Sequence, residues 1–107
     1  MKKILFICSH NKLRSPTAEA LFSDYPNLEV RSAGLKNDAD ISLGQEDVMW
    51  ADTIFVMEKA HLTKLKTKFR SLLKNQKVIC LDIPDKYAYM DEALIKILKN
   101  KVPPYLK

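Results

Sequence analysis

The alternation of apolar and polar positions along the chain predicts short buried strands separated by amphipathic helices. Four segments have the length and apolar content of strands, and they cover residues 3–7, 28–32, 53–57 and 77–81. Four others space their apolar residues as a helix does, and they cover residues 15–24, 43–51, 61–74 and 91–99. We expect Ser15 to cap the first helix, with Pro16 at its first helical position. Residues 33–40 are expected to form a loop.

This order of elements is typical of an α/β domain. Apolar strands separated by helical segments favour a central four-stranded parallel sheet with helices on both faces, which is a three-layer sandwich. The chain has 107 residues and no internal repeat or linker, so we expect a single domain over residues 1–107. Ligands of such folds bind beyond the carboxyl ends of the strands, and the loop from Cys8 to Arg14 follows the first strand.

The composition is that of an ordinary globular protein, with 47% apolar and 29% charged residues. The two cysteines, Cys8 and Cys80, are too few for a disulfide framework and fit a reducing compartment, so we expect a cytoplasmic protein. The apolar run at residues 4–8 is too short for a signal peptide, and no stretch reaches the length of a membrane span.

The net charge of +5 favours anionic partners in a general way. Much of the basic excess lies in one segment, at Lys59, Lys64, Lys66, Lys68, Arg70, Lys74 and Lys77. We interpret this segment as a solvated helix face, because no aromatic residues are interleaved for stacking on bases. The expected partners therefore include neither nucleic acid nor membrane.

The segment ICSHNKLRSP, residues 7–16, places a thiol and a guanidinium at the start of a helix. A cysteine there lies in the positive field of the helix dipole and of inward-facing loop N–H groups, which favours the thiolate. The same N–H groups can hold phosphate oxygens, and Arg14 adds a planar fork that matches two of them. The alternative is a buried apolar Cys8 beside a surface Arg14, but Asn11 and the Ser-Pro helix start favour a phosphate loop.

Such a loop can support covalent catalysis. The thiolate of Cys8 can attack phosphorus to give a phosphocysteine, which water then hydrolyses, and the hydroxyl of Ser15 can donate a hydrogen bond to the sulfur. The chain supplies the positive charge itself, so we expect neither a metal nor another cofactor. Phosphate or sulfate anions are expected to bind at the loop.

Residues Cys8, Asn11, Arg14, Ser15 and Pro16 resemble the signature of the low-molecular-weight protein tyrosine phosphatase family. Three later segments resemble the family in order along the chain, and they are RSAG at 31–34, EDVMWADTIFVMEKAHL at 46–62 and IPDKY at 83–87. The resemblance implies the strand order 2-1-3-4 and the activity of a phosphoric monoester hydrolase on phosphotyrosine, in a phosphorylated protein or a small aryl phosphate.

The resemblance also implies roles for individual residues. Cys8 would be the nucleophile and Arg14 the phosphate clamp, with Asn11 bracing the loop together with Ser32. Asp85, two residues before Tyr87, is favoured over Asp82 as the general acid that protonates the leaving phenolate and then activates water. The other implied site residues are the loop positions Ser9, His10, Lys12 and Leu13, the sulfur-tuning Ser15, and the candidate pocket walls Tyr87 and Tyr89.

The chain departs from the family pattern in several places. His10 replaces a common glycine, Leu13 stands where many members have a second cysteine, and Lys86 replaces the proline after the acid. The segment between Gly34 and Glu46 is short where the family has a long loop and helix, so we expect a more open pocket. Cys80 on the fourth strand is expected to be a core residue.

Three alternative functions are kept open. A cysteine-phosphorylated carrier domain of sugar transport would also have a cysteine after its first strand, but it would not need Arg14 or Asp85. An arsenate reductase on the same scaffold would need more cysteines than Cys80. A phosphopeptide-binding module would need no general acid. The favoured function is a metal-independent phosphomonoesterase; the oligomeric state and physiological substrate are not predicted.

Overall fold

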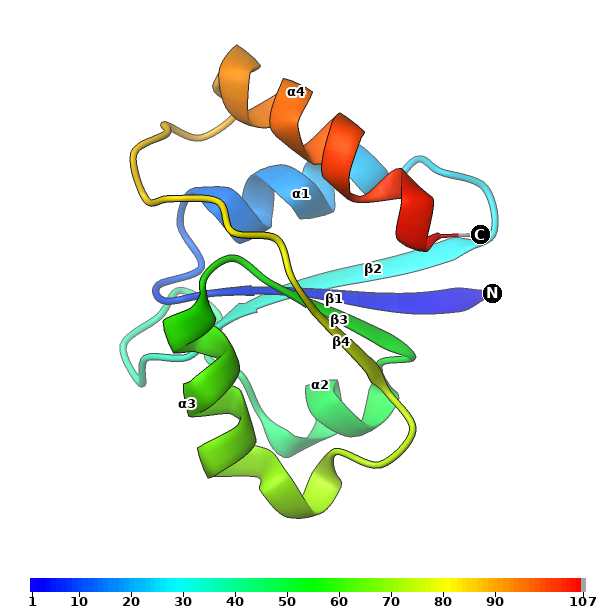
Figure 1. The fold of residues 1–107 in the computed structure, drawn as a ribbon, viewed down its shortest axis with the longest axis vertical. Coiled ribbons are helices and arrows are strands. Elements are labelled where there is room, and N and C mark those ends of the chain that lie inside the picture. The colour runs from blue at the N-terminus through cyan, green and yellow to red at the C-terminus, as the bar shows by residue number, and fades with distance from the viewer. Residues whose placement is uncertain (107) are drawn as a thin grey trace.

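The computed structural model describes residues 1–106, and its centre is a four-stranded parallel sheet (Figure 1). The strands are β1 (Lys2–Cys8), β2 (Leu28–Gly34), β3 (Thr53–Val56) and β4 (Lys77–Cys80). They are ordered β2-β1-β3-β4, which confirms the expected 2-1-3-4 order. β1 lies in the middle and pairs in parallel with both β2 and β3, so its carboxyl end opens at the centre of one sheet edge.

Helices cover both faces of the sheet, as Figure 1 shows. One face carries α1 (Arg14–Phe22) and α4 (Glu92–Lys101), and the other carries α2 (Gln45–Trp50) and α3 (Lys59–Phe69). Short 3₁₀ turns follow α3 at Arg70–Leu72 and α4 at Pro103–Tyr105. The expected three-layer α/β sandwich is therefore confirmed. No helix within residues 1–106 has the length and apolar character that a bilayer crossing requires.

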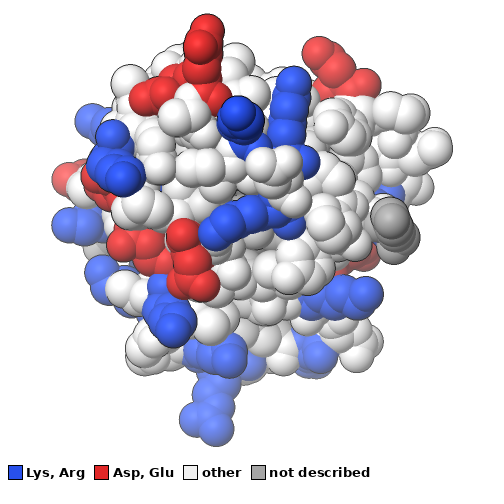
Figure 2. All heavy atoms as spheres, turned by 45° about the horizontal axis from the view of Figure 1, so that its top comes forward, with Lys and Arg blue, Asp and Glu red and all other residues white. Residues whose placement is uncertain are grey.

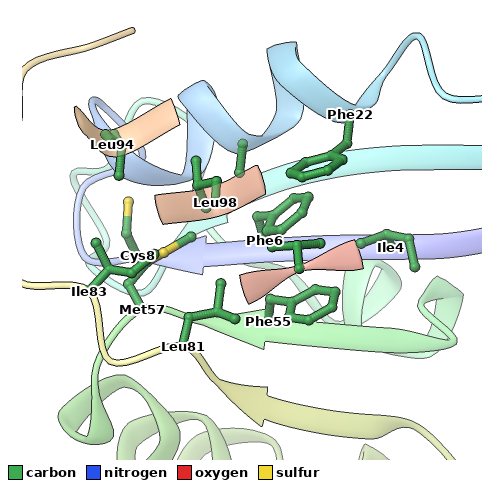
Figure 3. Close-up of a cluster of buried hydrophobic side chains, with 12 residues drawn as sticks. Ile4, Phe6, Cys8, Phe22, Phe55, Met57, Leu81, Ile83, Leu94 and Leu98 are labelled. Carbon is green, nitrogen blue, oxygen red and sulfur yellow. The ribbon is translucent and has the colours of Figure 1, made fainter. Parts of the chain in front are cut away.

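The side chains of β1 divide the core into two halves, because successive residues of a strand point to opposite faces. Ile4, Phe6 and Cys8 face α1 and α4, whereas Leu5 and Ile7 face α2 and α3. Figure 3 shows the first half, where the ring of Phe6 stacks between Phe22 and Phe55 with centroid distances of 5.8 and 5.3 Å. Cys8 is the last residue of this packed row, so the core fixes where its sulfur lies.

The boundaries of all four helices differ by some residues from those that the sequence pattern predicts, and residues 33–34 of the expected loop belong to β2. The differences at α1 and α3 bear on the site. α1 begins at Arg14 with Leu13 as its N-cap, so the expected cap at Ser15 is wrong. The hydroxyl of Ser15 contacts the sulfur of Cys8 instead of capping the helix. α3 begins at Lys59, two residues before the predicted start, and ends at Phe69, where the 3₁₀ turn replaces the predicted last helical residues.

Candidate active site

The sulfur of Cys8 is held by Ser15, and the direction of that hydrogen bond follows from its neighbours. Cys8 Sγ and Ser15 Oγ are 2.9 Å apart and both side chains are buried. Asn11 Nδ2 donates to the same Ser15 oxygen at 3.0 Å. Because an amide N–H can only donate, the hydroxyl hydrogen of Ser15 remains for the sulfur. Ser15 can therefore donate to Cys8, which is the direction that stabilises a thiolate.

Asn11 braces the loop after β1 from the inside. Its φ of 56° is in the left-handed region, which asparagine adopts more readily than most residues. Its Nδ2 also donates to Ser32 Oγ at 2.9 Å, and Ser32 Oγ donates to Glu19 Oε1 at 2.5 Å. The network links the loop to β2 and α1. Glu19 is a supporting residue that the sequence analysis missed.

The backbone of this phosphate loop, residues 8–15, offers free hydrogen-bond donors. In the part of the chain that the structure describes, the N–H groups of residues 9–15 donate to no backbone carbonyl or side chain of the chain. Arg14 and Ser15 are also the first residues of α1, so the positive end of its helix dipole lies at the same place. Together these groups form a site that favours a multiply charged anion.

Arg14 is tied down on one side of its guanidinium. Its side chain is only 3% exposed, and Nη1 donates to Glu58 Oε2 at 2.6 Å and to the Ile83 carbonyl at 2.7 Å. Both hydrogens of Nη1 are thereby used. The Nε and Nη2 groups remain, and this edge of the fork can hold two phosphate oxygens. Glu58 was not among the predicted site residues.

The candidate acids differ in their position relative to Arg14. Asp85 Oδ1 lies 3.8 Å from Arg14 Nε, and its side chain is 61% exposed. Asp82 has a φ of 53° and accepts a weak hydrogen bond from the thiol of Cys80 at 3.5 Å. The structure places Asp85 beside the phosphate loop, whereas Asp82 borders a separate hollow with Glu58 and Pro84.

The acid loop, residues 82–90, is held at both ends. The N–H of Ile83 donates to the Met57 carbonyl at 2.8 Å, while its own carbonyl accepts from Arg14. At the far end, the N–H of Met90 donates to Thr17 Oγ1 on α1 at 3.0 Å. Asp85 therefore lies on a short span between two fixed points.

A small pocket of about 90 Å³ opens over the phosphate loop. Seven of the described residues line it, namely Cys8, Ser9, His10, Lys12, Leu13, Arg14 and Asp85. Tyr87 and Tyr89 do not line it; Tyr87 packs against the core beside α4, and Tyr89 is exposed. His10 and Lys12 are exposed at the rim, where Lys12 lies 4.0 Å from Asp40. The described pocket has no aromatic wall.

The start of α3 contributes a buried histidine to the phosphate loop. His61 Nδ1 accepts the N–H of Glu58 at 3.1 Å, so the ring hydrogen lies on Nε2, which is 3.0 Å from Ser9 Oγ. Burial, followed by the positive charge of Arg14, lowers the pKa of His61 to about 4. His61 is therefore neutral near pH 7. Among residues 1–106, no three His, Cys, Asp or Glu side chains gather as metal ligands would.

The lowered pKa of His61 makes a prediction about stability. Because its folded pKa of about 4 lies below the ordinary 6.5, the unfolded chain binds more protons between these values. The free energy of unfolding should fall by about 2 kcal/mol as the pH drops from 7 to 5. Urea unfolding at pH 7 and pH 5 checks this, with His61→Gln expected to flatten the dependence. The exposed His10→Gln variant is the matched control and should keep it.

The short segment after β2 packs directly on the phosphate loop. Leu35 donates to the Cys8 carbonyl, Lys36 to the Ser9 carbonyl and Asp40 to the His10 carbonyl, each at 3.0 Å. Gly34 lies where the segment after β2 meets the phosphate loop. A Cβ at this position would lie 2.5 Å from Ala39 Cβ and 2.6 Å from the Ser9 carbonyl oxygen. The segment after β2 therefore supports the phosphate loop that it borders.

We expect Gly34→Ala to destabilise the protein by about 2–4 kcal/mol and to weaken phosphate binding about tenfold, because backbone of the phosphate loop must move. Gly44→Ala is the control from the chain's other glycine, since a Cβ there meets nothing closer than 3.9 Å. Thermal unfolding with and without phosphate measures both effects. Equal behaviour of the two variants would contradict the close packing at Gly34.

Residues 3–43 match the family model described as "Low molecular weight phosphotyrosine protein phosphatase". This stretch contains β1, the phosphate loop, α1 and β2, so the resemblance drawn from the sequence is confirmed. No curated protein sequence matches the chain.

Solved structures share the fold over nearly the whole chain. Wzb of Vibrio vulnificus in complex with benzylphosphonate is 25% identical, with a TM-score of 0.78 over 97% of this chain and 96% of that one. The tyrosine phosphatase Wzb from Escherichia coli K30 in complex with phosphate is 21% identical, with a TM-score of 0.77 over 97% and 95%. The YwlE arginine phosphatase from Geobacillus stearothermophilus is 22% identical, with a TM-score of 0.72 over 94% and 85%.

Proposed function

We propose that this chain, which has the fold and the phosphate loop of the low molecular weight phosphotyrosine protein phosphatases, is a metal-independent phosphomonoesterase that acts on phosphotyrosine. The observation that carries the proposal is that the Cys8 sulfur, 2.9 Å from the Ser15 hydroxyl, lies in a loop with unpaired N–H groups and a buried Arg14. A tetrahedral dianion bound there has its phosphorus facing the thiolate.

The first chemical step transfers the phosphoryl group to sulfur. The loop N–H groups and the Nε/Nη2 edge of Arg14 bind the non-bridging oxygens, and Cys8 Sγ attacks phosphorus as the bond to the phenolic oxygen breaks. Asp85, protonated, gives its proton to the departing phenolate. The products are a phosphocysteine and a free phenol.

The second step hydrolyses the phosphocysteine. Asp85, now a carboxylate at the open side of the pocket, takes a proton from water as the water oxygen attacks phosphorus. The S–P bond breaks, and the electron pair returns to the sulfur, where the hydroxyl of Ser15 stabilises it. Inorganic phosphate leaves, and Asp85 is protonated for the next cycle.

The alternative functions fit these contacts less well. A cysteine carrier domain does not require a buried arginine fork or a carboxylate 3.8 Å from it. A reductase needs a second reactive thiol, but burial raises the pKa of the Cys80 thiol, which disfavours its thiolate. The solved structures that share the fold include a tyrosine phosphatase and an arginine phosphatase, so the identity of the leaving group needs its own test.

The test is hydrolysis of p-nitrophenyl phosphate in EDTA, with rapid quenching to trap the phosphoenzyme. We expect turnover without metal and a phosphoryl group bound covalently to Cys8. Phosphotyrosine, phosphoserine and phosphoarginine peptides of one sequence then identify the leaving group, with phosphotyrosine expected to be hydrolysed fastest. A requirement for added metal, or the absence of any phosphocysteine, would refute the proposal.

A further inference from the structure

The positive charges of this protein are unevenly distributed. Residues 59–77 contain seven Lys and Arg residues and no Asp or Glu. The remainder has eleven basic and thirteen acidic residues, so the net charge of +5 consists of +7 in this segment and −2 elsewhere. We call the exposed basic residues of this segment the α3 basic surface, and its members are Lys59, Lys64, Lys66, Lys68, Arg70, Lys74 and Lys77.

These charges are available to a partner. α3 buries His61, Leu65 and Phe69 against the sheet, while all seven basic side chains are exposed. Within residues 1–106, none of the seven forms an ion pair with a carboxylate at a separation of 4.0 Å or less. In Figure 2 the lower end of the molecule, where α3 lies in Figure 1, shows mainly basic side chains.

An ordinary solvated helix face alternates charges of opposite sign, because pairs four residues apart then attract each other. α3 does the reverse. Lys64 and Lys68 are like charges four residues apart in α3, and Lys66 has the same spacing from Arg70, the C-cap of the helix. These pairs repel each other in the free protein, and a bound anion would relieve that repulsion.

The α3 basic surface starts at the candidate active site. The N-cap of α3 is Glu58, which holds Arg14, and His61 in its first turn contacts Ser9. Lys64 is close enough to His61 to lower its pKa further. The eleven residues of α3 extend about 16 Å from this point, a distance that about five extended residues of a bound chain would cover.

We infer that the α3 basic surface binds an acidic segment that flanks the phosphorylated residue in a protein substrate, an inference that rests on the proposed phosphatase function. The only aromatic residue in 59–77 is the buried Phe69, so the surface offers no side chain for stacking on bases. Adsorption to a lipid surface would favour exposed apolar side chains, but none of the exposed large apolar side chains of residues 1–106 belongs to the α3 basic surface. An acidic peptide needs only the charges that are present.

The experiment compares three phosphotyrosyl peptides that differ only in five flanking residues, which are all Glu, all Gln or all Lys. We expect kcat/KM at low ionic strength to be about tenfold higher for the Glu peptide than for the Gln peptide, and the difference to shrink in 0.5 M salt. Turnover of p-nitrophenyl phosphate reports the active site separately, because this substrate is too small to reach the α3 basic surface.

Two double variants remove equal charge from different helices. Lys64→Gln with Lys68→Gln should lose about fivefold in kcat/KM for the Glu peptide, with p-nitrophenyl phosphate turnover unchanged. Lys96→Gln with Lys99→Gln, on α4 at the opposite face of the sheet, should retain the preference. Equal kcat/KM for the Glu and Gln peptides, or equal losses in both variants, would overturn the inference.

Other outcomes separate a failure of this inference from a failure of the proposed phosphatase function. Turnover of p-nitrophenyl phosphate without turnover of any peptide would overturn the inference while leaving the phosphatase function in place. Lys64- and Lys68-dependent binding of single-stranded DNA, or of vesicles with anionic lipid, at affinities above that for the Glu peptide would assign the surface to another partner. Loss of p-nitrophenyl phosphate turnover in the wild type would refute the proposed function itself.

Discussion

Cys8→Ser is expected to lower the turnover of aryl phosphates by about 10⁴-fold or more while leaving phosphate binding nearly unchanged. A serine hydroxyl in this place is a far weaker nucleophile at neutral pH than a thiolate, so no covalent intermediate forms. The loop N–H groups, Arg14 and the Asn11 network do not depend on the sulfur, so the anion still binds. Steady-state kinetics with p-nitrophenyl phosphate and calorimetric titration with phosphate measure the two effects.

Cys80→Ser is the matched control for this prediction, since it changes the other cysteine of the chain. It should retain most of the activity. A Cys8→Ser protein that still turns over substrate would show that the sulfur is not the nucleophile. If the same variant lost phosphate affinity together with its fold, thermal unfolding would reveal it.

Asp85→Asn is expected to lower kcat for phenyl phosphate by about 10²–10³-fold, because phenolate is a poor leaving group without a proton. The loss should be only about tenfold for p-nitrophenyl phosphate, whose leaving group needs less help. This dependence on the leaving group identifies an acid, since a structural defect would lower both rates equally. Steady-state kcat values for the two substrates provide the comparison.

Asp82→Asn is the control for the acid assignment. Asp82 borders a hollow outside the pocket and contacts Cys80, so its replacement should change kcat less than threefold for either substrate. If Asp82→Asn showed the dependence on the leaving group and Asp85→Asn did not, the two roles would have to be exchanged.

The sequence predicts the layered fold well because both of its signals are local. Apolar runs of strand length and apolar residues at helical spacing lie next to one another along the chain, and their alternation allows few arrangements. The residues at which helices and strands begin and end are harder to predict from the sequence. Ser15 has the residue type of a helix cap, yet the tertiary contact with Cys8 uses its hydroxyl, and no neighbouring residue in the sequence reveals that contact.

The phosphate loop could be predicted because its chemistry lies within a run of ten residues. Its supports could not, because they come from distant parts of the chain. Glu58 lies 44 residues from Arg14, and His61 lies 52 residues from Ser9. One local signal was present, since a glutamate followed three residues later by a polar side chain resembles a capping box, and the structure contains one at Glu58.

The pocket walls were the least predictable part. Tyr87 and Tyr89 are the right residue types at the right distance from Asp85, but the side chain of Tyr87 turns toward the core beside α4. Which way a loop side chain points depends on the packing of the helix behind it, and the local sequence holds little information about that.

The two fixed ends of the acid loop limit how the enzyme can open and close. Because Arg14 holds the Ile83 carbonyl and Thr17 holds the Met90 N–H, only the six residues between them are free to shift with the reaction cycle. In the proposed mechanism, Asp85 would exchange roles between proton donor and acceptor by a small local adjustment, without the large-scale gating that slows product departure in many enzymes. The chemical steps, rather than movement of the loop, would then limit the rate of turnover.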